Sequence, residues 1–543
     1  MEKRTLIALA LSFLVLGFYP VILQKFYPDH YKTKQQTAVK SSPTTAQDTE
    51  KIQTIQTPAF GEVAKFKTEK DLVFQNNRLK LIFNPKSGAV REILFLKFIN
   101  SETNNPLVLF TLDSPIGATT YVHLLDKGPL TDQAVPDYAL EARENQVDGR
   151  ADYGEIKLSK TYLFHNDNYG ADLSLNFENT SDKAIEFRYQ LVIGTTIPAR
   201  HSIDSQYVET NFYSMVDGKP ALRHIKETGK GKTVESQGTL QWAAVKDRHF
   251  SIILKPKTGE EFTGLVEGLG NHQSNASLIS GRLTLPPGGS KKQDFLIYIG
   301  PNEVEELLPF GLDPIVNFGK LDAIGRLLVG GLELLHKVFR NYGIAIIVLT
   351  ILINLLLFPL TRLSYMSMKR MQLIQPHMTK LREHHKKNPE KLNKDMMELY
   401  KKHKVNPFGG CLPMILQMPV FMALYVALSK SAILINSKML WIKDLSSPDS
   451  VTLPWALPYL GNQIHLLPLI MCGAMFFQQK FTQIKMEGQD PAVAAQQKMM
   501  AWMMPIIFGF IFYTMPSGLV IYWLTNTILM TLYQLHLKKV TLT

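Results

Sequence analysis

The sequence predicts an α-helical membrane bundle, with one N-terminal anchor and a five-helix core, joined to a large extracytoplasmic antiparallel β-sandwich domain. Two stretches without Asp, Glu, Lys or Arg, residues 343–360 and 411–428, are long enough to cross the core of a bilayer. The segment between them is polar and strongly basic. Residues from about 66 to 300 instead alternate apolar and polar side chains, as strands with one buried face do.

The basic segment determines the predicted topology. It holds twelve Lys and Arg against four Asp and Glu, which is +8 of the formal net charge of +12 for the 543 residues. A short loop so rich in Lys and Arg stays in the cytoplasm. Residues 24–342 then lie outside the cytoplasm, and both termini lie inside it.

Charge and cysteine content argue against some classes of protein. The positive charge could suit a nucleic-acid-binding protein, but it lies beside membrane spans, where topology and anionic lipid account for it. Both cysteines, Cys411 and Cys472, lie in apolar stretches, so we expect no disulfide in the polar half of the chain.

Residues 1–23 are predicted to form the N-terminal transmembrane anchor. A cleaved signal peptide is the alternative, but no small-x-small cleavage pattern follows the apolar run, and the sequence has no lipobox cysteine. Residues 24–64 are rich in Thr, Gln, Ser and Lys, which predicts a flexible periplasmic tether.

Residues 65–318 are predicted to form the periplasmic β-sandwich. The apolar residues Leu173, Leu175 and Phe177 alternate with polar ones, and turn clusters such as residues 84–88 and 286–289 separate the strands. Residues 228–233 (TGKGKT) resemble a phosphate loop, but Lys226 stands where such a loop needs a glycine, so we interpret them as a solvated hairpin tip. The histidines of this domain lack the spacing of metal ligands.

Residues 319–341 predict an amphipathic helix in the outer membrane–water interface, because apolar residues recur at helical spacing just before a span. The alternative is a helix packed against the β-domain. Residues 342–361 form the predicted second span.

Residues 362–410 are predicted to form a basic cytoplasmic helical hairpin that turns at Asn388-Pro389. One helix would be lined by Leu363, Met366, Ile374, Met378 and Leu381, and the other by Leu392, Met396, Leu399 and Tyr400. Methionine adapts to varied apolar partners, so this stripe could contact hydrophobic nascent segments, or could simply be the core of the hairpin. The predicted contact residues of the hairpin are Arg362, Lys369, Arg370, Met371 and Met378.

Four further spans complete the bundle. The predicted segments are span 3 at 411–430, a periplasmic loop at 431–463, span 4 at 464–480, a cytoplasmic loop at 481–498, spans 5 and 6 at 499–515 and 518–537, and a cytoplasmic tail at 538–543. The apolar runs of the five C-terminal spans, 343–360, 411–428, 464–479, 499–515 and 518–537, contain no Asp, Glu, Lys or Arg, which argues against an ion-coupled transporter. Their uncharged polar residues are Thr350, Asn354, Gln417, Tyr522, Thr525, Asn526 and Thr527. These groups could join helices by hydrogen bonds, or could line a hydrated groove.

Three stretches resemble the signature sequences of the YidC/Oxa membrane protein insertases, in their Gram-negative YidC form. They are VNPFGGC at 405–411, QMPVF at 417–421 and PSGLVIYWLTN at 516–526. The resemblance implies an insertase and chaperone, not an enzyme, that needs no nucleotide, metal or other cofactor. Its implied partners are nascent membrane proteins, the Sec translocon, and ribosomes or targeting factors at the cytoplasmic face.

The resemblance also implies that the polar spans enclose a hydrated groove for the substrate. Thr350 matches the family's groove threonine, and Tyr522 with Trp523 matches its aromatic pair. Asn354 stands where the family commonly has an arginine. We therefore expect polarity and shape, or charges such as Arg362 at the groove mouth, to attract the substrate.

Two other classes of function compete with an insertase. A transporter or channel would need deep ionisable residues or paired inverted repeats, and neither is evident in the sequence. A membrane-anchored sugar-processing enzyme would need paired carboxylates in the β-domain, and none is convincingly placed.

Overall fold

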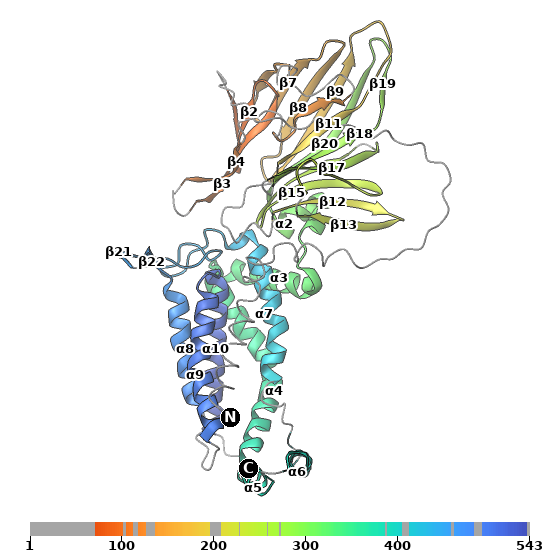
Figure 1. Ribbon diagram of the computed structural model, residues 1–543. Helices are drawn as coiled ribbons and strands as arrows, with labels where there is room; N and C mark the ends of the chain where they lie inside the picture. The colour runs from red at the N-terminus through yellow and green to blue at the C-terminus, as the bar shows by residue number, and fades with distance from the viewer. Residues whose placement is uncertain are drawn as a thin grey trace, which may run out of the picture.

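The computed structural model describes residues 71–100, 105–111, 118–125, 136–195, 208–226, 228–257, 259–270, 273–385, 388–403, 405, 412–457, 461–482 and 491–539. The predicted anchor (1–23) and tether (24–64) lie outside these ranges. In the described part, a β-domain stands at one end of a helical bundle, and two short helices lie at the opposite end (Figure 1).

The β-domain contains two large antiparallel sheets. The nine-stranded sheet has the order β13 (Lys219–Ile225), β12 (Glu209–Val216), β15 (Thr239–Lys246), β16 (Phe250–Pro256), β20 (Ser290–Pro301), β9 (Gly170–Asn179), β8 (Ile156–Phe164), β7 (Gln146–Asp152), β6 (Ala139–Ala142). The five-stranded sheet has the order β14 (Thr233–Glu235), β17 (Phe262–Gly270), β18 (Gln273–Ser280), β11 (Tyr189–Thr195), β5 (Val122–Leu124). The predicted antiparallel β-sandwich is therefore confirmed.

Smaller sheets complete the strands. A four-stranded sheet runs β1 (Leu72–Gln75), β2 (Leu79–Asn84), β3 (Ala89–Ile99), β4 (Pro106–Thr111), and two-stranded ones pair β10 (Ile185–Phe187) with β19 (Leu283–Leu285) and β21 (Val451–Leu457) with β22 (Gly461–Ile464). The last pair lies in the predicted periplasmic loop 431–463, at the end of the bundle that faces the β-domain (Figure 1).

The predicted alternation holds in β9, where Leu173, Leu175 and Phe177 are fully buried. It fails in β11, where Gln190 and Val192 are buried as well. Val192 packs against Tyr121 and its neighbours on the face turned away from the main core. Both faces of β11 are therefore covered, since Val192 has apolar partners and Gln190 Nε2 donates to the Ser277 hydroxyl at 2.8 Å.

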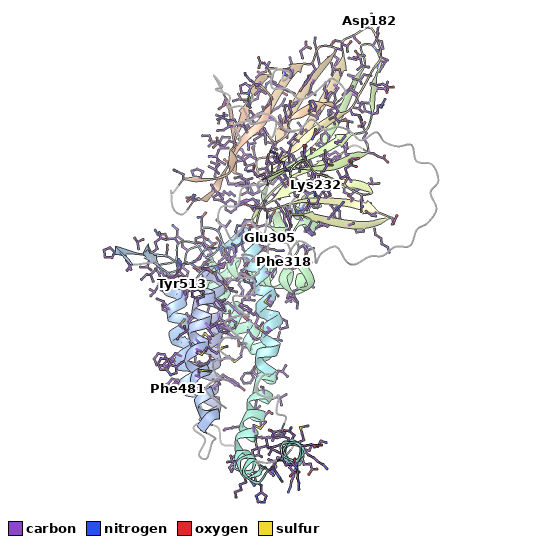
Figure 2. The ribbon with its side chains drawn as sticks, in the orientation of Figure 1. Asp182, Lys232, Glu305, Phe318, Phe481 and Tyr513 are labelled. Carbon is purple, nitrogen blue, oxygen red and sulfur yellow. The ribbon has the colours of Figure 1, made fainter. Side chains whose placement is uncertain are left out.

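Residues 228–233 connect β13 in one sheet to β14 in the other, so they are not a hairpin tip as predicted. The Lys232 amide donates to the Gly229 carbonyl at 2.8 Å, and the chain then enters a strand. A phosphate loop leads into a helix N-terminus, and none follows here. The lysines of this turn are exposed, and Figure 2 labels Lys232 in the half of the β-domain nearer the helical bundle.

The helices follow the β-domain in the chain. They are α2 (Val304–Leu307), α3 (Asp322–Phe339), α4 (Tyr342–Leu373), α5 (Gln375–His384), α6 (Pro389–Lys402), α7 (Leu412–Lys430), α8 (Leu466–Thr482), α9 (Pro491–Phe512) and α10 (Ser517–Lys539), with short 3-10 turns at Leu308–Phe310, Asp313–Ile315, Gly319–Leu321 and Ala432–Leu434. Among the described residues, Tyr342–Met371 is the one helix long and apolar enough by itself to cross a membrane, while Leu466–Phe481 and Trp502–Phe512 are shorter apolar helices.

Helix α3 buries one apolar face and exposes another. Leu328 and Leu332 are buried in the core of the bundle, whose other members come largely from α4, α7, α8 and α10. Leu327, Leu334 and Val338 are 74%, 65% and 69% exposed. The exposed apolar stripe suits the predicted position in the membrane interface, but Val329 of the same helix packs into the core of the β-domain. The interfacial position therefore stays a prediction.

Helix α4 continues twelve residues beyond the predicted end of its span at residue 361. It ends at Leu373, and after Ile374 the chain starts α5 with Pro376 in its first turn. A proline lacks the amide hydrogen that would continue the hydrogen bonding of α4, but it suits the start of a new helix. The first hairpin helix is thus split between α4 and α5. Leu363, predicted to line that helix, is 63% exposed. The predicted turn is confirmed, since Asn388 caps α6 by accepting from the Lys391 amide at 3.1 Å.

The remaining helices alternate in direction along the bundle. In Figure 2, Tyr513, just after α9, lies at the end near the β-domain, and Phe481 of α8 lies toward the opposite end. The chain reverses between α9 and α10, where the Ser517 amide donates to the Ser447 carbonyl at 2.9 Å. This alternation places the basic hairpin and the β-domain at opposite ends of the bundle (Figure 1).

Candidate functional site

A pocket of about 140 Å³ lies between α4 and α10, and we call it the α4–α10 pocket. Its wall consists of Ile351, Asn354, Leu355, Phe358 and Thr361 from α4, with Leu529, Met530 and Tyr533 from α10. The polar groups of the wall are an amide, a hydroxyl and a phenol, set among apolar side chains. The pocket can therefore offer hydrogen bonds without carrying a net charge.

Asn354 reaches this pocket from a helix face that it shares with Thr350. The Thr350 hydroxyl is fully buried and donates to the Ile346 carbonyl at 2.6 Å. Asn354 Nδ2 donates to the Thr350 carbonyl at 2.8 Å. Each side chain thus donates a hydrogen bond to the backbone carbonyl one turn earlier in the helix. The donor therefore has a partner in an apolar surrounding. Thr350 lies behind the pocket and is not part of its wall.

Gln417 and Tyr522 join two helices. Gln417 Nε2 on α7 donates to the Tyr522 hydroxyl on α10, and both side chains are buried. This is the interhelical hydrogen bond that the sequence suggested as one role for these polar groups. Neither residue belongs to the wall of the α4–α10 pocket.

Trp523 lies in an aromatic cluster. Its ring centre is 4.9 Å from that of Phe421 on α7, and 5.2 Å and 5.3 Å from those of Phe508 and Phe512 on α9. Edge-to-face and offset contacts of this kind hold helices together. Trp523 therefore packs α7, α9 and α10 against one another and does not line the pocket.

Thr525 and Asn526 are half-buried on α10, one turn before the pocket residues of that helix. Asn526 Oδ1 is buried and accepts no hydrogen bond from the described residues. A buried acceptor left unpaired costs about 1–3 kcal/mol. Such an atom calls for water or a polar group of a bound segment.

The hairpin has its own small core. Ile374, Met378 and Val405 are buried there, with Met371, Met396, Leu399 and Tyr400 packed against them. Met378 is 9% exposed and lies in this core, which favours the second of the two interpretations given for the methionine stripe, and its contact with a substrate stays a prediction. Arg362 and Arg370 are exposed, and Lys369 and Met371 are half-buried. The exposed Arg362 and Arg370 can be reached by a partner, whereas most of the apolar stripe is covered.

The sequence did not single out Thr361 and Tyr533, which lie in the wall of the pocket. Thr361 stands seven residues after Asn354, which is two helical turns and hence the same face of α4. This helical spacing could have indicated Thr361 from the sequence, but the residue lies at the predicted end of the span. Tyr533 packs edge-on against Phe358, with ring centres 4.9 Å apart.

In the part of the chain that the structure describes, no group of three or more His, Cys, Asp or Glu could hold a metal ion.

Two protein families match the chain. The YidC periplasmic domain matches residues 71–330, and the 60Kd inner membrane protein family matches residues 334–542. A membrane protein insertase YidC from Geotalea daltonii is 32% identical, with 99% of each chain covered, and one from Geobacter metallireducens is 30% identical, with 99% of this chain and 98% of that protein covered. A crystal structure described as an active YidC insertase matches with a TM-score of 0.37 and 22% identity, over 90% of this chain and 96% of that one.

Proposed function

Since the chain belongs to the family of YidC membrane protein insertases, inner membrane proteins with a periplasmic domain, we propose that it inserts and helps fold membrane proteins through a hydrated groove formed around the α4–α10 pocket. The family is not enzymatic, and the proposed mechanism needs no nucleotide, metal or other cofactor. The observation that carries the proposal is the uncharged polar group of Asn354 in an apolar pocket between α4 and α10.

The chemistry of the groove suits a segment that is partly polar. The hydrophilic end of a substrate would enter from the cytoplasmic side and hydrogen-bond to Asn354, Thr361 or water, which lowers the cost of moving polar groups into the membrane. Its apolar segment would then pass between α4 and α10 into lipid, because burial of apolar surface is favourable. The unpaired Asn526 oxygen is a further acceptor on α10.

The orientation of the chain follows from charge. The hairpin carries most of the positive surplus, so it faces the cytoplasm together with both termini, and the β-domain faces the periplasm. The exposed Arg362 and Arg370 would meet an acidic substrate tail, ribosomal RNA or a targeting factor at the groove mouth. The Sec translocon is the partner expected within the membrane, and anionic lipid would surround the basic segment.

Depletion of the protein in cells, followed by pulse-labelled synthesis of a small two-span protein, tests the function. Protease protection reports whether the loop between the two spans crosses the membrane. We expect the loop to stay inside in depleted cells, and a wild-type copy to restore its translocation. Normal insertion in depleted cells, with collapse of a solute gradient, would support a transporter and overturn the proposal.

The variant Asn354→Leu tests the groove itself, because leucine has a similar size and no hydrogen-bonding group. Leu356→Ala is the matched control, since Leu356 lies on the same helix and is 80% exposed, away from the pocket. We expect Asn354→Leu to slow insertion of substrates with polar tails and Leu356→Ala to have no such effect. Equal rates for wild type and Asn354→Leu would show that the pocket is not the path.

A further inference from the structure

A second pocket, of about 390 Å³, lies where the β-domain meets the helical bundle. We call it the junction pocket. Its walls come from β12, the end of β13, the β15–β16 turn, the residue after β20, the turns after residue 313 and the last residue of α7. Figure 2 shows Phe318, beside this pocket in the chain, between the two parts of the molecule. Segments far apart in the sequence thus form one cavity at the boundary.

The junction pocket has a surplus of positive charge. Its charged residues are Lys226, Lys246, Arg248 and Lys430, with His224, against the carboxylates Glu209 and Asp247. Both carboxylates are already engaged. Glu209 pairs with Lys246 at 3.2 Å and with His224 at 3.1 Å. Asp247 Oδ1 accepts from two backbone amides of the β15–β16 turn, at 2.7 Å and 2.6 Å.

Main-chain carbonyls hold the cations in place. Lys430 donates to the Asn317 carbonyl at 2.6 Å, and Lys246 donates to the Ile315 carbonyl at 3.2 Å. Arg248 Nε donates to the Ser429 carbonyl. A carbonyl orients a cation but carries no formal charge. Asp444 acts on Arg248 and Asp322 acts on Lys430 from outside the pocket wall. Within the wall, Lys430 faces the like charges of Lys246 and Lys226, so a region of positive potential remains there.

Asn302 adds a second type of group to the same wall. It is 6% exposed, and its Nδ2 donates to the Asp247 carbonyl at 3.3 Å. Its Oδ1 is buried and accepts no hydrogen bond from the described residues. The pocket therefore combines an excess of cationic donors with an acceptor that a hydroxyl group could satisfy.

The position of the pocket relates it to the membrane surface. Lys430 ends α7 at the end of the bundle that carries the β-domain (Figure 1). In an inner membrane protein with a periplasmic domain, this end lies level with the phosphates of the outer leaflet. That placement depends on family membership and not on the proposed groove.

We propose that the junction pocket binds a phosphate ester that also carries a hydroxyl group, either the headgroup of an anionic phospholipid or a soluble glycerol phosphate. Lys and Arg bind phosphate oxygens through charge-assisted hydrogen bonds, and an anion here would offset the surplus of positive charge. The bound phosphate would touch both the β15–β16 turn and the end of α7. It would therefore fix the β-domain to the bundle.

Native mass spectrometry of the full chain in detergent, with added phosphatidylglycerol or phosphatidylcholine, tests the site. We expect tighter binding of phosphatidylglycerol, and a loss of about a hundredfold in its affinity for Lys226→Gln/Lys430→Gln, since the variant removes two charge-assisted contacts that are each worth about a factor of ten. The matched control is Lys219→Gln/Lys443→Gln, which removes the same charge from exposed sites on β13 and in the loop after α7. Lys226→Gln alone, at an exposed residue, should lose affinity without affecting the fold.

Hydrogen exchange in phosphatidylcholine nanodiscs separates the two sources of phosphate. Protection of residues 313–321 by added glycerol phosphate, and less by inorganic phosphate, would identify a soluble ligand. Protection only when phosphatidylglycerol replaces phosphatidylcholine would identify the lipid, and either result supports the site. Equal loss of affinity in the pocket and control variants, or no protection by any phosphate, would overturn the proposal. Insertion is not part of either measurement, so this failure would leave the proposed function untouched.

Discussion

Gln417 and Tyr522, 105 residues apart in the chain, join α7 to α10 through a hydrogen bond between two buried side chains. Each group would be costly to bury alone, because an unpaired polar atom in an apolar surrounding loses its bonds to water. The pair therefore fixes how these two helices meet, beside the aromatic cluster around Trp523.

The first prediction concerns this pair. Gln417→Leu should lower the stability of the bundle by about 1–3 kcal/mol, because it leaves the Tyr522 hydroxyl buried without a partner. Adding Tyr522→Phe should restore much of the loss, since both partners are then apolar. Thermal unfolding of the wild type, both single variants and the double variant in detergent measures the coupling. Additive effects of the two substitutions would contradict a direct interaction.

The bundle shows what the sequence could predict. The long apolar runs without charged residues, and the basic segment between two of them, are properties of local composition. They were enough to predict the order of the helices along the chain. The exact ends depended on single residues instead. Helix α4 ends twelve residues past the predicted boundary, just before α5 starts with Pro376 in its first turn, because helix continuity is decided by backbone geometry and not by hydropathy.

The candidate site was predicted less completely. Spacing placed Thr350 and Asn354 on one face of a helix, and the structure agrees. It could not separate Asn354, which reaches the pocket, from Gln417 and Tyr522, which pair with each other, since that depends on contacts between distant segments. The junction pocket was not foreseen for the same reason, because six separate segments form its walls.

The second prediction concerns Lys160, which is buried in the β-domain with no carboxylate beside it. Its ammonium donates to the carbonyls of Ser87 and Thr120 at 3.2 Å and 3.0 Å, and burial lowers its pKa from 10.5 to about 7. Between these two values the unfolded chain binds a proton that the folded chain does not. Stability should therefore rise with pH, by roughly 2 kcal/mol from pH 7 to pH 9.

Unfolding of the full chain, followed through amide exchange in β8 and β9, measures this dependence. Lys160→Met should remove the rise with pH, because methionine has a similar length and does not titrate. Lys157→Met, at an exposed position of the same strand, should keep it. An unchanged slope in Lys160→Met would show that Lys160 keeps its proton in the fold.

The third prediction concerns the hairpin. Met378→Asn should open α5 and α6, because an amide buried without partners costs about 2 kcal/mol or more. Limited trypsin digestion of the full chain in detergent should then cleave the hairpin lysines about tenfold faster. Met397→Asn is the control, since Met397 lies on α6 and is 54% exposed. Similar digestion of both variants would place Met378 outside the core.

The last prediction concerns Asn354→Arg. The pocket opens between α4 and α10 and has no charged group in its wall, so a guanidinium there has room to reach water or a substrate carboxylate. We expect the variant to fold, to keep inserting substrates with neutral tails, and to speed insertion most for substrates with acidic tails, because the added charge attracts them. Protease protection of matched substrates with acidic, neutral and basic tails measures the difference. The benefit should shrink at high salt if it is electrostatic. Loss of insertion for every substrate would mean that the groove depends on the asparagine amide itself, and not on polarity that another hydrophilic group can supply.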